Sequence, residues 1–483
     1  MNRIKLLAVL LAAYVLCAST TSAAFAIETV ADVGRLYPVQ VEAVVQLDDT
    51  AEFQRLVQEA NTNRKTVSIS GSKHSQGSHT AADGAVVLDM RKYDKVLSID
   101  KERKIITVQS GATWDTVQRA INDQGLALKV MQSSNIFTVG GTMSANAHGR
   151  DIDSTAFIET VESFRLLLAN GTIVNVSRSE NPELFRQTIG GYGMFGVILD
   201  ATIELTKNDV YRTRTVSIPY TDFPDYFDMH IKNNASIALM LVRPSIDPDN
   251  LFTDLSIMLW DKTTSTESQG IDTTLTEESN VRRDKFFFDL SRKYDWGKKL
   301  RWWLQKRLEA SAGRLVTRNN AMRPPEAPLE LLKHESPKDT DLLQEYFIPK
   351  KDFIAFSTEF KRILEEDKTN VISFTIRYVH PNNEAALSYA PSEDSFAVIY
   401  YSNVPLTEEG LAQAQATQRK IIDAALANNG KYYLTYNLFP TVQQLRAAYP
   451  EIDNVFRVKR KYDTNEVFRS KFYDHYRAQG VGQ

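Results

Sequence analysis

Cysteine is nearly missing from this sequence of 483 residues, since Cys17 is the only one. A chain with a single cysteine cannot form an internal disulfide or a cysteine zinc site. The sequence also lacks an H-x-x-x-H pair, a G-x-S-x-G motif and a Walker pattern, which excludes the usual zinc hydrolase, serine esterase and P-loop arrangements. We therefore expect no metal site, and any catalysis must use other groups.

Long hydrophobic runs are also absent. The longest run, residues 6–18, is too short to cross a bilayer, and it follows Arg3 and Lys5 and precedes small residues that end in Ala24-Phe25-Ala26. This pattern predicts a secretory signal peptide over residues 1–26, cleaved after about Ala26, rather than an uncleaved anchor. We expect a periplasmic or secreted protein whose mature part lacks cysteine.

Excess positive charge is missing as well. The net charge is −3, and removal of residues 1–26 takes away Arg3 and Lys5 but no acid, which makes it −5. This mildly acidic balance argues against a nucleic-acid partner.

Glycine becomes scarce beyond the first two fifths of the chain. Residues 39–205 are dense in short strands and turn glycines, whereas after Gly196 the next glycines are Gly270, Gly297 and Gly313. We place a domain boundary near Lys207. Beyond it, strands at 237–242, 371–378 and 396–401 and helices at 298–309 and 411–428 predict an antiparallel sheet with helices on one face.

The most informative stretch is residues 66–77, T-V-S-I-S-G-S-K-H-S-Q-G. A buried strand ends in a turn of glycine and small polar residues, and such a turn directs several backbone N–H groups at one point. It therefore predicts an anion cradle for a phosphate or pyrophosphate, with His74 in its middle.

Two further glycine segments follow. Residues 138–149, T-V-G-G-T-M-S-A-N-A-H-G, are mostly small and would let a flat ligand or another backbone approach closely. Residues 190–196, G-G-Y-G-M-F-G, contain the letters G-x-G-x-x-G, but a helix precedes them and a strand follows. The nicotinamide-binding fingerprint needs the opposite order, so these letters do not indicate an ordinary Rossmann domain.

Taken in order, the three segments resemble the FAD-binding domain of the vanillyl-alcohol oxidase / p-cresol methylhydroxylase (PCMH) flavoprotein family, nearest to its sugar and lactone oxidases and cytokinin dehydrogenases. The resemblance implies an α+β fold, with a PCMH-type FAD-binding domain of two α/β subdomains and an antiparallel-sheet cap that supplies most of the substrate site. The implied division is 35–208 for the FAD domain, 209–435 for the cap and 436–483 for a C-terminal segment that returns to the FAD domain.

The resemblance also implies site residues. His74 falls where many members attach the flavin covalently, and His79 is a distant second choice; Lys73 lies where the family often has glycine. The residues expected to contact FAD are Gly71, Ser72, Lys73, His74, Ser75, Thr138, Gly140, Gly141, Ser144, His148 and Ile198.

The cap matches the family less well. Sugar and lactone oxidases carry a Glu-x-Arg pair over the flavin. In this sequence Arg377 is present, but Thr375 replaces the glutamate. The His-Trp-Gly-Lys signature of the lactone oxidases is also missing, and residues 433–436 occupy its general region. Lys459, Tyr462 and Asp463 resemble the family's closing K-x-x-Y-D-P segment. We predict Arg377, Glu345 and Tyr378 as catalytic residues, with His380, Tyr400 and Tyr401 as further candidates.

The expected function is an exported FAD-dependent oxidase. It would move hydride from a CH–OH group of a carbohydrate-like or other small alcohol to covalently bound FAD, with oxygen or another acceptor reoxidising the flavin. The alternatives are an FAD dehydrogenase of an amine or hydroxy acid and a secreted binding protein with a vestigial flavin fold.

Residues 284–307 combine aromatic residues with eight lysines and arginines. They could lie on a membrane surface, or form a cap helix with a buried aromatic face.

Overall fold

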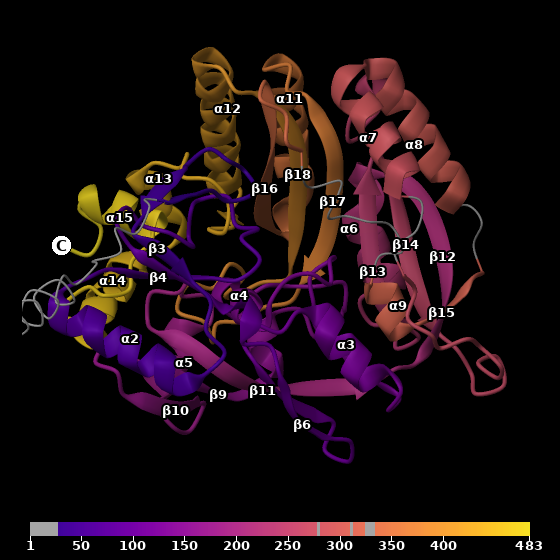
Figure 1. Cartoon of the computed structure of the whole chain (residues 1–483). Coiled ribbons are helices and arrows are strands. Elements are labelled where there is room, and N and C mark those ends of the chain that lie inside the picture. Colours follow the sequence, from indigo (N-terminus) through magenta and orange to yellow (C-terminus); the bar gives the residue numbers. More distant parts are fainter. Residues whose placement is uncertain (1–27, 278–280, 310–312, 324–333) are drawn as a thin grey trace, which may run out of the picture.

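The computed structural model describes residues 28–277, 281–309, 313–323 and 334–483. The predicted signal peptide lies outside these residues. Figure 1 shows a lower part built from the N-terminal half of the chain and an upper part, the cap, built from the C-terminal half. The whole is α+β, which confirms the predicted fold class.

A small parallel sheet carries the predicted anion cradle. Its strand order is β3-β5-β4, and it can be parallel because helix α2 carries the chain from β3 to β4. Phe53, Val57 and Ala60 recur at helical spacing on the buried side of α2. The elements are β1 (Glu28–Val30), β2 (Val39–Val41), β3 (Ala43–Val45), α2 (Thr50–Asn63), β4 (Val67–Ser70), β5 (Val86–Asp89) and η1 (Met90–Lys92).

A second sheet of the N-terminal half is antiparallel. It has the order β10-β9-β11-β7-β6, with β8 paired to β11. The Asn170-Gly171 turn joins β9 to β10, and Asn-Gly is a preferred pair for tight hairpin turns. The elements are β6 (Val96–Asp100), β7 (Ile105–Gln109), α3 (Trp114–Asn122), β8 (Leu126–Leu128), α4 (Val139–Ala145), η2 (Phe157–Thr160), β9 (Val161–Leu167), β10 (Ile173–Ser177), α5 (Pro182–Thr188) and β11 (Val197–Lys207).

The cap is built on an eight-stranded sheet in the order β15-β12-β14-β13-β17-β18-β16-β19. Every pair in it is antiparallel, in agreement with the predicted antiparallel-sheet cap. The strands are β12 (Val210–Pro219), β13 (Ile237–Pro244), β14 (Asp254–Lys262), β15 (Leu315–Thr317), β16 (Asp339–Pro349), β17 (Val371–Val379), β18 (Ser395–Pro405) and β19 (Lys431–Tyr432).

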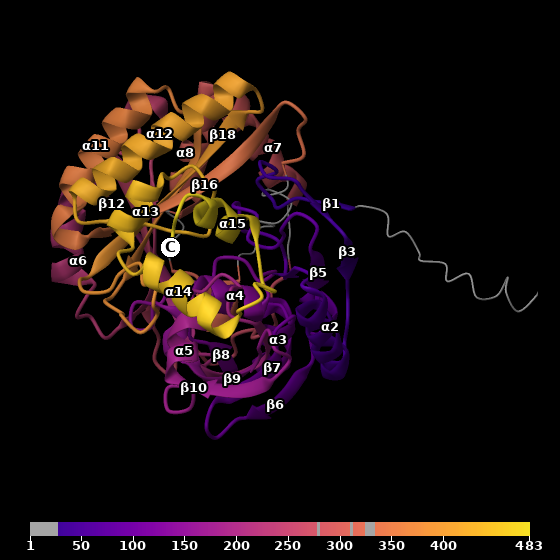
Figure 2. The same ribbon diagram turned by 90° about the vertical axis from the view of Figure 1, so that its left-hand side faces the viewer.

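The two faces of the cap sheet have different neighbours. On one face Tyr346 and Tyr400 pack against Phe360 of helix α11, and Figure 2 shows α11 and α12 lying over the sheet. On the other face Phe347 and Ala397 share one hydrophobic cluster with core residues of the N-terminal half. The site-bearing face therefore packs directly on the N-terminal half. The helical elements here are η3 (Tyr220–Asp222), α6 (Phe223–His230), η4 (Pro248–Asn250), α9 (Arg318–Met322), η5 (Lys350–Asp352), α11 (Phe353–Glu366) and α12 (Glu408–Ala427).

Helices α7 (Val281–Lys293) and α8 (Asp295–Glu309) form a hairpin at the end of the cap sheet away from the N-terminal half (Figure 1). Phe288 of α7 packs with Leu343, Ile372 and Tyr401, on the same face of the sheet as Phe347. Arg292 is buried and pairs with Asp341, its Nη2 2.5 Å from the carboxylate. These contacts anchor the hairpin on the cap.

The C-terminal segment runs back to the N-terminal half. It contains α13 (Val442–Ala448), α14 (Ile452–Tyr462) and α15 (Lys471–Ala478). Phe468 lies beside Val67 in a parallel bridge, and the Ser68 hydroxyl donates to the Arg469 carbonyl across 401 positions of sequence. Strand β4, which leads into the anion cradle, is therefore supported by residues far along the chain.

Element ends differ from the sequence-based expectations by a few residues. The helix expected at 298–309 begins at Asp295, the helix expected at 411–428 spans Glu408–Ala427, and the strand expected at 396–401 spans Ser395–Pro405. Ends are poorly marked in sequence because several residue types can close the last turn of a helix.

Candidate active site

The first two glycine segments meet directly. A Cβ atom at Gly71 would lie 2.2 Å from Thr138 Oγ1, so only glycine permits this approach. The Ser72 hydroxyl donates to the Ile136 carbonyl at 2.6 Å, and Gly140 N–H donates to the Ser110 carbonyl at 2.8 Å. The end of β4 is thus held against the start of α4.

The third glycine segment, residues 190–196, is hydrogen-bonded to the second, residues 138–149. Gly190 N–H donates to the Met143 carbonyl and Tyr192 N–H to the Ser144 carbonyl, at 3.0 and 2.9 Å. Ile198 lies on β11 directly after this turn and is buried. The structure therefore brings together all three segments that the sequence singled out.

Buried hydroxyls around this junction lack hydrogen-bond partners among the described residues. They belong to Ser70, Ser75, Ser110 and Ser134. Buried polar atoms are rarely left unpaired in proteins, so a polar ligand is expected beside them. A cofactor with phosphate oxygens and a polar ring system fits these hydroxyls.

His74 lies in the cradle, half buried, with its ring edge-on to Phe137 at 5.1 Å between centroids. His79 is placed differently. It is buried, its Nε2 is 2.8 Å from the Leu434 carbonyl, and it stacks on Phe472. Burial lowers the pKa of His79 to about 4, so it is a neutral core residue at physiological pH.

Lys73 adopts a left-handed backbone conformation, with φ of 57°. This explains why glycine suits the position, since a side chain in this region strains the backbone. The lysine is tolerated, but it is not the residue that the turn favours.

Replacing Lys73 with glycine should therefore stabilise the fold by about 1 kcal/mol. Lys73→Ala is the matched control, because alanine removes the charge but keeps the Cβ atom. Denaturant midpoints of both variants measure the effect. Equal midpoints for the two variants would show that the lysine charge, and not the backbone, matters here.

A buried hydrogen-bonded pair joins the second segment to the cap. His148 Nε2 lies 2.5 Å from Glu345 Oε1, and both side chains are only 2% exposed. The Tyr436 hydroxyl donates to Glu345 Oε2 at 3.1 Å. Burial opposes ionisation of Glu345, but the close contact with His148, then the charge of Arg377 and the hydrogen bond from Tyr436, outweighs it and lowers the pKa of the carboxyl.

Arg377 lies on the same side of the cap sheet. Its Nη2 donates to the Ser133 hydroxyl at 2.7 Å and its Nη1 to the His148 carbonyl at 3.3 Å. Of the three predicted catalytic residues, Arg377 and Glu345 are thus brought together. Tyr378 lies on the opposite face of β17, where its hydroxyl donates to Asp394 at 2.6 Å and its ring packs on Phe227.

Strand register explains how Glu345 reaches the site. Ile399 of β18 pairs with Thr375 on one side and with Glu345 on the other, so these residues form one row across the sheet. Glu345 thus lies in the same row as Thr375, two strands away. Residues two strands apart are separated by roughly 10 Å of backbone, so Glu345 does not stand in the place of Thr375, and its carboxylate contacts His148 and Tyr436 instead.

The other sequence candidates lie elsewhere. His380 pairs with Glu159 at 3.1 Å, Tyr400 faces the helices and Tyr401 faces the α7–α8 hairpin. Tyr436 and Ser133 belong to the cluster but were not predicted. Gln76 was not predicted either. Its backbone N–H donates to the Thr435 carbonyl at 3.0 Å, and its side-chain oxygen accepts a hydrogen bond from Leu343 N–H of β16.

The geometry agrees with the comparisons to known proteins. A family profile described as "FAD binding domain" matches residues 41–177. This stretch is an FAD-binding domain. The resemblance to the PCMH-type flavoproteins is confirmed, and FAD is the cofactor that the cradle, the unpaired hydroxyls and His74 would hold.

Several curated proteins are similar over this region. L-gulonolactone oxidase of Bos taurus is 28% identical over 200 residues, 41% of this chain and 45% of the relative. Decaprenylphosphoryl-beta-D-ribose oxidase of Mycolicibacterium smegmatis is 29% identical over 178 residues, 36% and 39% of the two chains. Cytokinin dehydrogenase 2 of Arabidopsis thaliana is 27% identical over 198 residues, 40% and 39%. The chain spans less than half the length of each of these relatives.

Proposed function

We propose that this chain is an exported FAD-dependent oxidoreductase that oxidises a CH–OH group of a carbohydrate-like or other small alcohol. Oxygen or another acceptor would reoxidise the flavin. The observation that carries the proposal is the buried His148–Glu345 pair, since it places proton-handling groups beside an FAD-binding domain. The similarity to oxidases and dehydrogenases supports the same reaction class.

Bound FAD would supply a two-electron acceptor for the hydride. The protein must then take the hydroxyl proton. The lowered pKa of Glu345 favours a carboxylate that accepts a hydrogen bond from His148 Nε2. His148 Nδ1 is buried and has no hydrogen-bond partner among the described residues, so it is the ring atom that can accept a proton.

Glu345 therefore acts as a positioning residue for His148, and Tyr436 fixes the second carboxylate oxygen. Arg377 supplies a positive charge that stabilises negative charge developing near the pair. The alternatives are a dehydrogenase of an amine or hydroxy acid and a binding protein that carries no working flavin.

The colour of the purified protein and its oxygen consumption distinguish the oxidase from the dehydrogenase and the binding protein. A purified yellow protein that consumes oxygen with alditols, sugars or lactones supports the proposal. Turnover only with amines or hydroxy acids favours the dehydrogenase. A colourless protein that takes up no FAD would contradict both enzyme functions.

We also propose that the flavin is attached covalently through His74. In His74→Ala the yellow colour should move from the acid-precipitated pellet to the supernatant, because the cradle still holds FAD but no bond retains it. His230→Ala, at an exposed position on α6, is the control and should leave the flavin in the pellet. Flavin that stays with precipitated His74→Ala would place the attachment elsewhere.

Two further segments, residues 1–26 and 284–307, bear on where the protein acts. The sequence of residues 1–26 supports export to a periplasm or outside the cell. We propose in addition that residues 284–307 contact a membrane surface, independently of the redox chemistry.

A further inference from the structure

The α7–α8 hairpin carries most of the large apolar side chains that the described part of the chain exposes. Seven such residues are exposed by 40% or more of their surface, and four of them lie here: Phe286, Tyr294, Trp296 and Trp303. Single exposed apolar residues are common on proteins, but a group of aromatic side chains on one element indicates an interaction surface.

The hairpin is also strongly basic. Residues 281–309 contain ten lysines and arginines and four acidic residues, a net charge of +6 in a chain whose net charge is −3. Some of this charge is neutralised, since Arg292 pairs with Asp341 and Lys299 with Asp249 at 2.5 Å. Arg282, Lys293 and Arg307 remain exposed to solvent.

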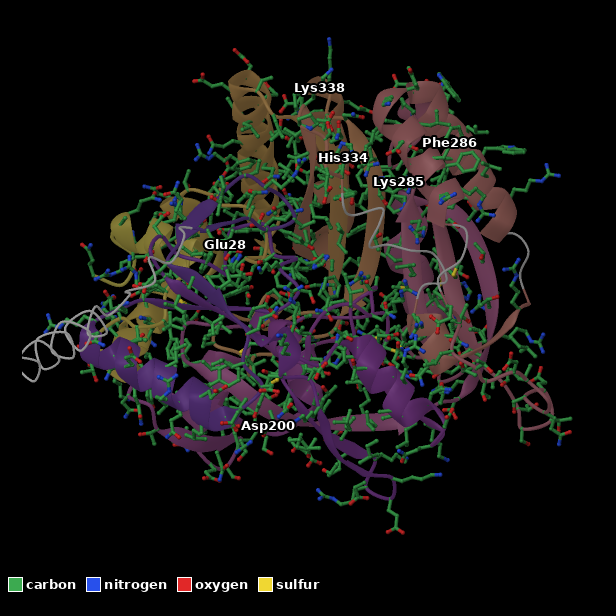
Figure 3. The ribbon with its side chains drawn as sticks, viewed as in Figure 1. Glu28, Asp200, Lys285, Phe286, His334 and Lys338 are labelled. Atoms are coloured by element: carbon green, nitrogen blue, oxygen red, sulfur yellow. The ribbon has the colours of Figure 1, made fainter. Side chains whose placement is uncertain are left out.

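Aromatic and basic residues share the outer sides of both helices. On α8, Trp296, Lys299, Trp303 and Arg307 recur at spacings of three and four residues, so they line one exposed stripe. On α7, Arg282, Phe286 and Lys293 follow at spacings of four and seven residues, which also places them on one side of the helix. Figure 3 labels Lys285 and Phe286 at the end of the molecule opposite Asp200 of the N-terminal sheet.

We infer that this hairpin docks the protein on an anionic phospholipid surface, which deepens the membrane contact proposed above. Tryptophan and tyrosine rings lie preferentially at the boundary between headgroups and acyl chains, and lysine and arginine are attracted by anionic headgroups. No helix among the described residues is long and apolar enough to cross a membrane, so the contact is one of surface binding.

The packing of the hairpin gives this contact an orientation. Phe288 packs on Tyr401, the register partner of Leu343 in β16, and Glu345 lies two residues beyond Leu343 on the same face. Two residues of strand span about 7 Å. Docking through α7 and α8 therefore brings the cap face that holds Glu345 close to the lipid surface.

Vesicle co-sedimentation of the full-length flavoprotein tests the inference. We expect binding to phosphatidylcholine vesicles that contain phosphatidylglycerol and at least tenfold weaker binding to phosphatidylcholine alone. Binding should fall severalfold between about 0.1 M and about 1 M salt, as the screening length drops from about 10 to about 3 Å. Two of the five tryptophans, Trp296 and Trp303, are exposed, so their emission should shift to shorter wavelength on binding.

Matched variants locate the surface. Trp296→Ser with Trp303→Ser should lower binding at least tenfold. Met229→Ser with Ile354→Ser should not, although these apolar side chains on α6 and α11 are also exposed, by 71% and 40%. Arg282→Gln with Lys293→Gln should weaken binding to anionic vesicles, and Lys92→Gln with Lys101→Gln should leave it unchanged.

Binding that survives both hairpin variants would overturn the inference, as would absence of binding to anionic vesicles. Self-association in sedimentation velocity that disappears in the tryptophan variant would also overturn it, because the surface would then face a second copy of the chain. Vesicle binding needs no substrate turnover, so a protein that binds vesicles but oxidises nothing would refute the proposed activity alone.

Discussion

Glu345→Gln should lower kcat by about 10²-fold or more while FAD stays bound, because removing the partner of a proton-transfer residue costs on this scale. Glutamine has nearly the same shape, so the fold is kept, but it no longer holds His148 through a negative charge. Steady-state kinetics with any substrate found in the oxygen screen measures the effect. The loss should fall mainly on kcat, since the pair acts on the reacting proton and not on substrate binding.

The matched variant is Tyr436→Phe. It removes one hydrogen bond to Glu345 and keeps the contact between Glu345 and His148, so we expect a loss of up to about tenfold. A Glu345→Gln enzyme with wild-type kcat, or a Tyr436→Phe enzyme with the larger loss, would contradict the assigned roles.

The contribution of the His148–Glu345 pair to the free energy of unfolding should depend on pH. The folded-state pKa of Glu345 is lowered from an ordinary value of 4.5, so its stabilisation is fully present above about pH 4.5 and is lost as the pH falls through the folded pKa. The difference in unfolding free energy between the wild type and Glu345→Gln should therefore shrink in acid. A difference that grows in acid would contradict an ionised carboxylate.

Asp463→Ala should cost about 3–5 kcal/mol of stability, the largest structural effect that we predict. Lys459 is fully buried, and its Nζ lies 2.9 Å from the Asp463 carboxylate. The same carboxylate accepts hydrogen bonds from the N–H groups of Val467 and Phe468, both at 2.8 Å. Alanine would leave a buried cation and two N–H groups unpaired.

Two further variants make this result interpretable through denaturant midpoints. Lys459→Met removes the buried charge and keeps the acceptor for both N–H groups, so it should cost less than Asp463→Ala and remain measurable if that variant does not fold. The neighbouring Lys461–Glu183 pair is exposed, and Glu183→Gln should cost under about 1 kcal/mol. Equal effects of Asp463→Ala and Glu183→Gln would contradict the role of the buried pair.

Local patterns predicted much of this fold. The strand at 67–70, the cap strand at 371–379 and the cap helix at 408–427 depend on neighbouring residues, so the sequence signals them directly. The three glycine segments were recognisable because tight backbone approaches admit few residue types, as Gly71 beside Thr138 illustrates.

The pairing within the site could not be predicted in this way. His148 and Glu345 are 197 positions apart, and only the register of β16, β18 and β17 places Glu345 in the row of Thr375. Tyr378 was predicted beside Arg377, but neighbouring residues in a strand point to opposite faces. Tyr436 follows β19 in a turn whose course depends on Gln76, which no local pattern reveals.

Because of the bridge between Val67 and Phe468, the FAD-binding domain can be completed only after the end of the chain has been made. The edge of the sheet that leads into the FAD cradle is incomplete until residues beyond 460 have been synthesised and, for an exported chain, translocated. Newly made FAD domains would therefore remain immature while the cap is produced, and flavin loading would be a late step. For the same reason, a fragment limited to residues 41–177 should not mature into a flavin-binding unit by itself.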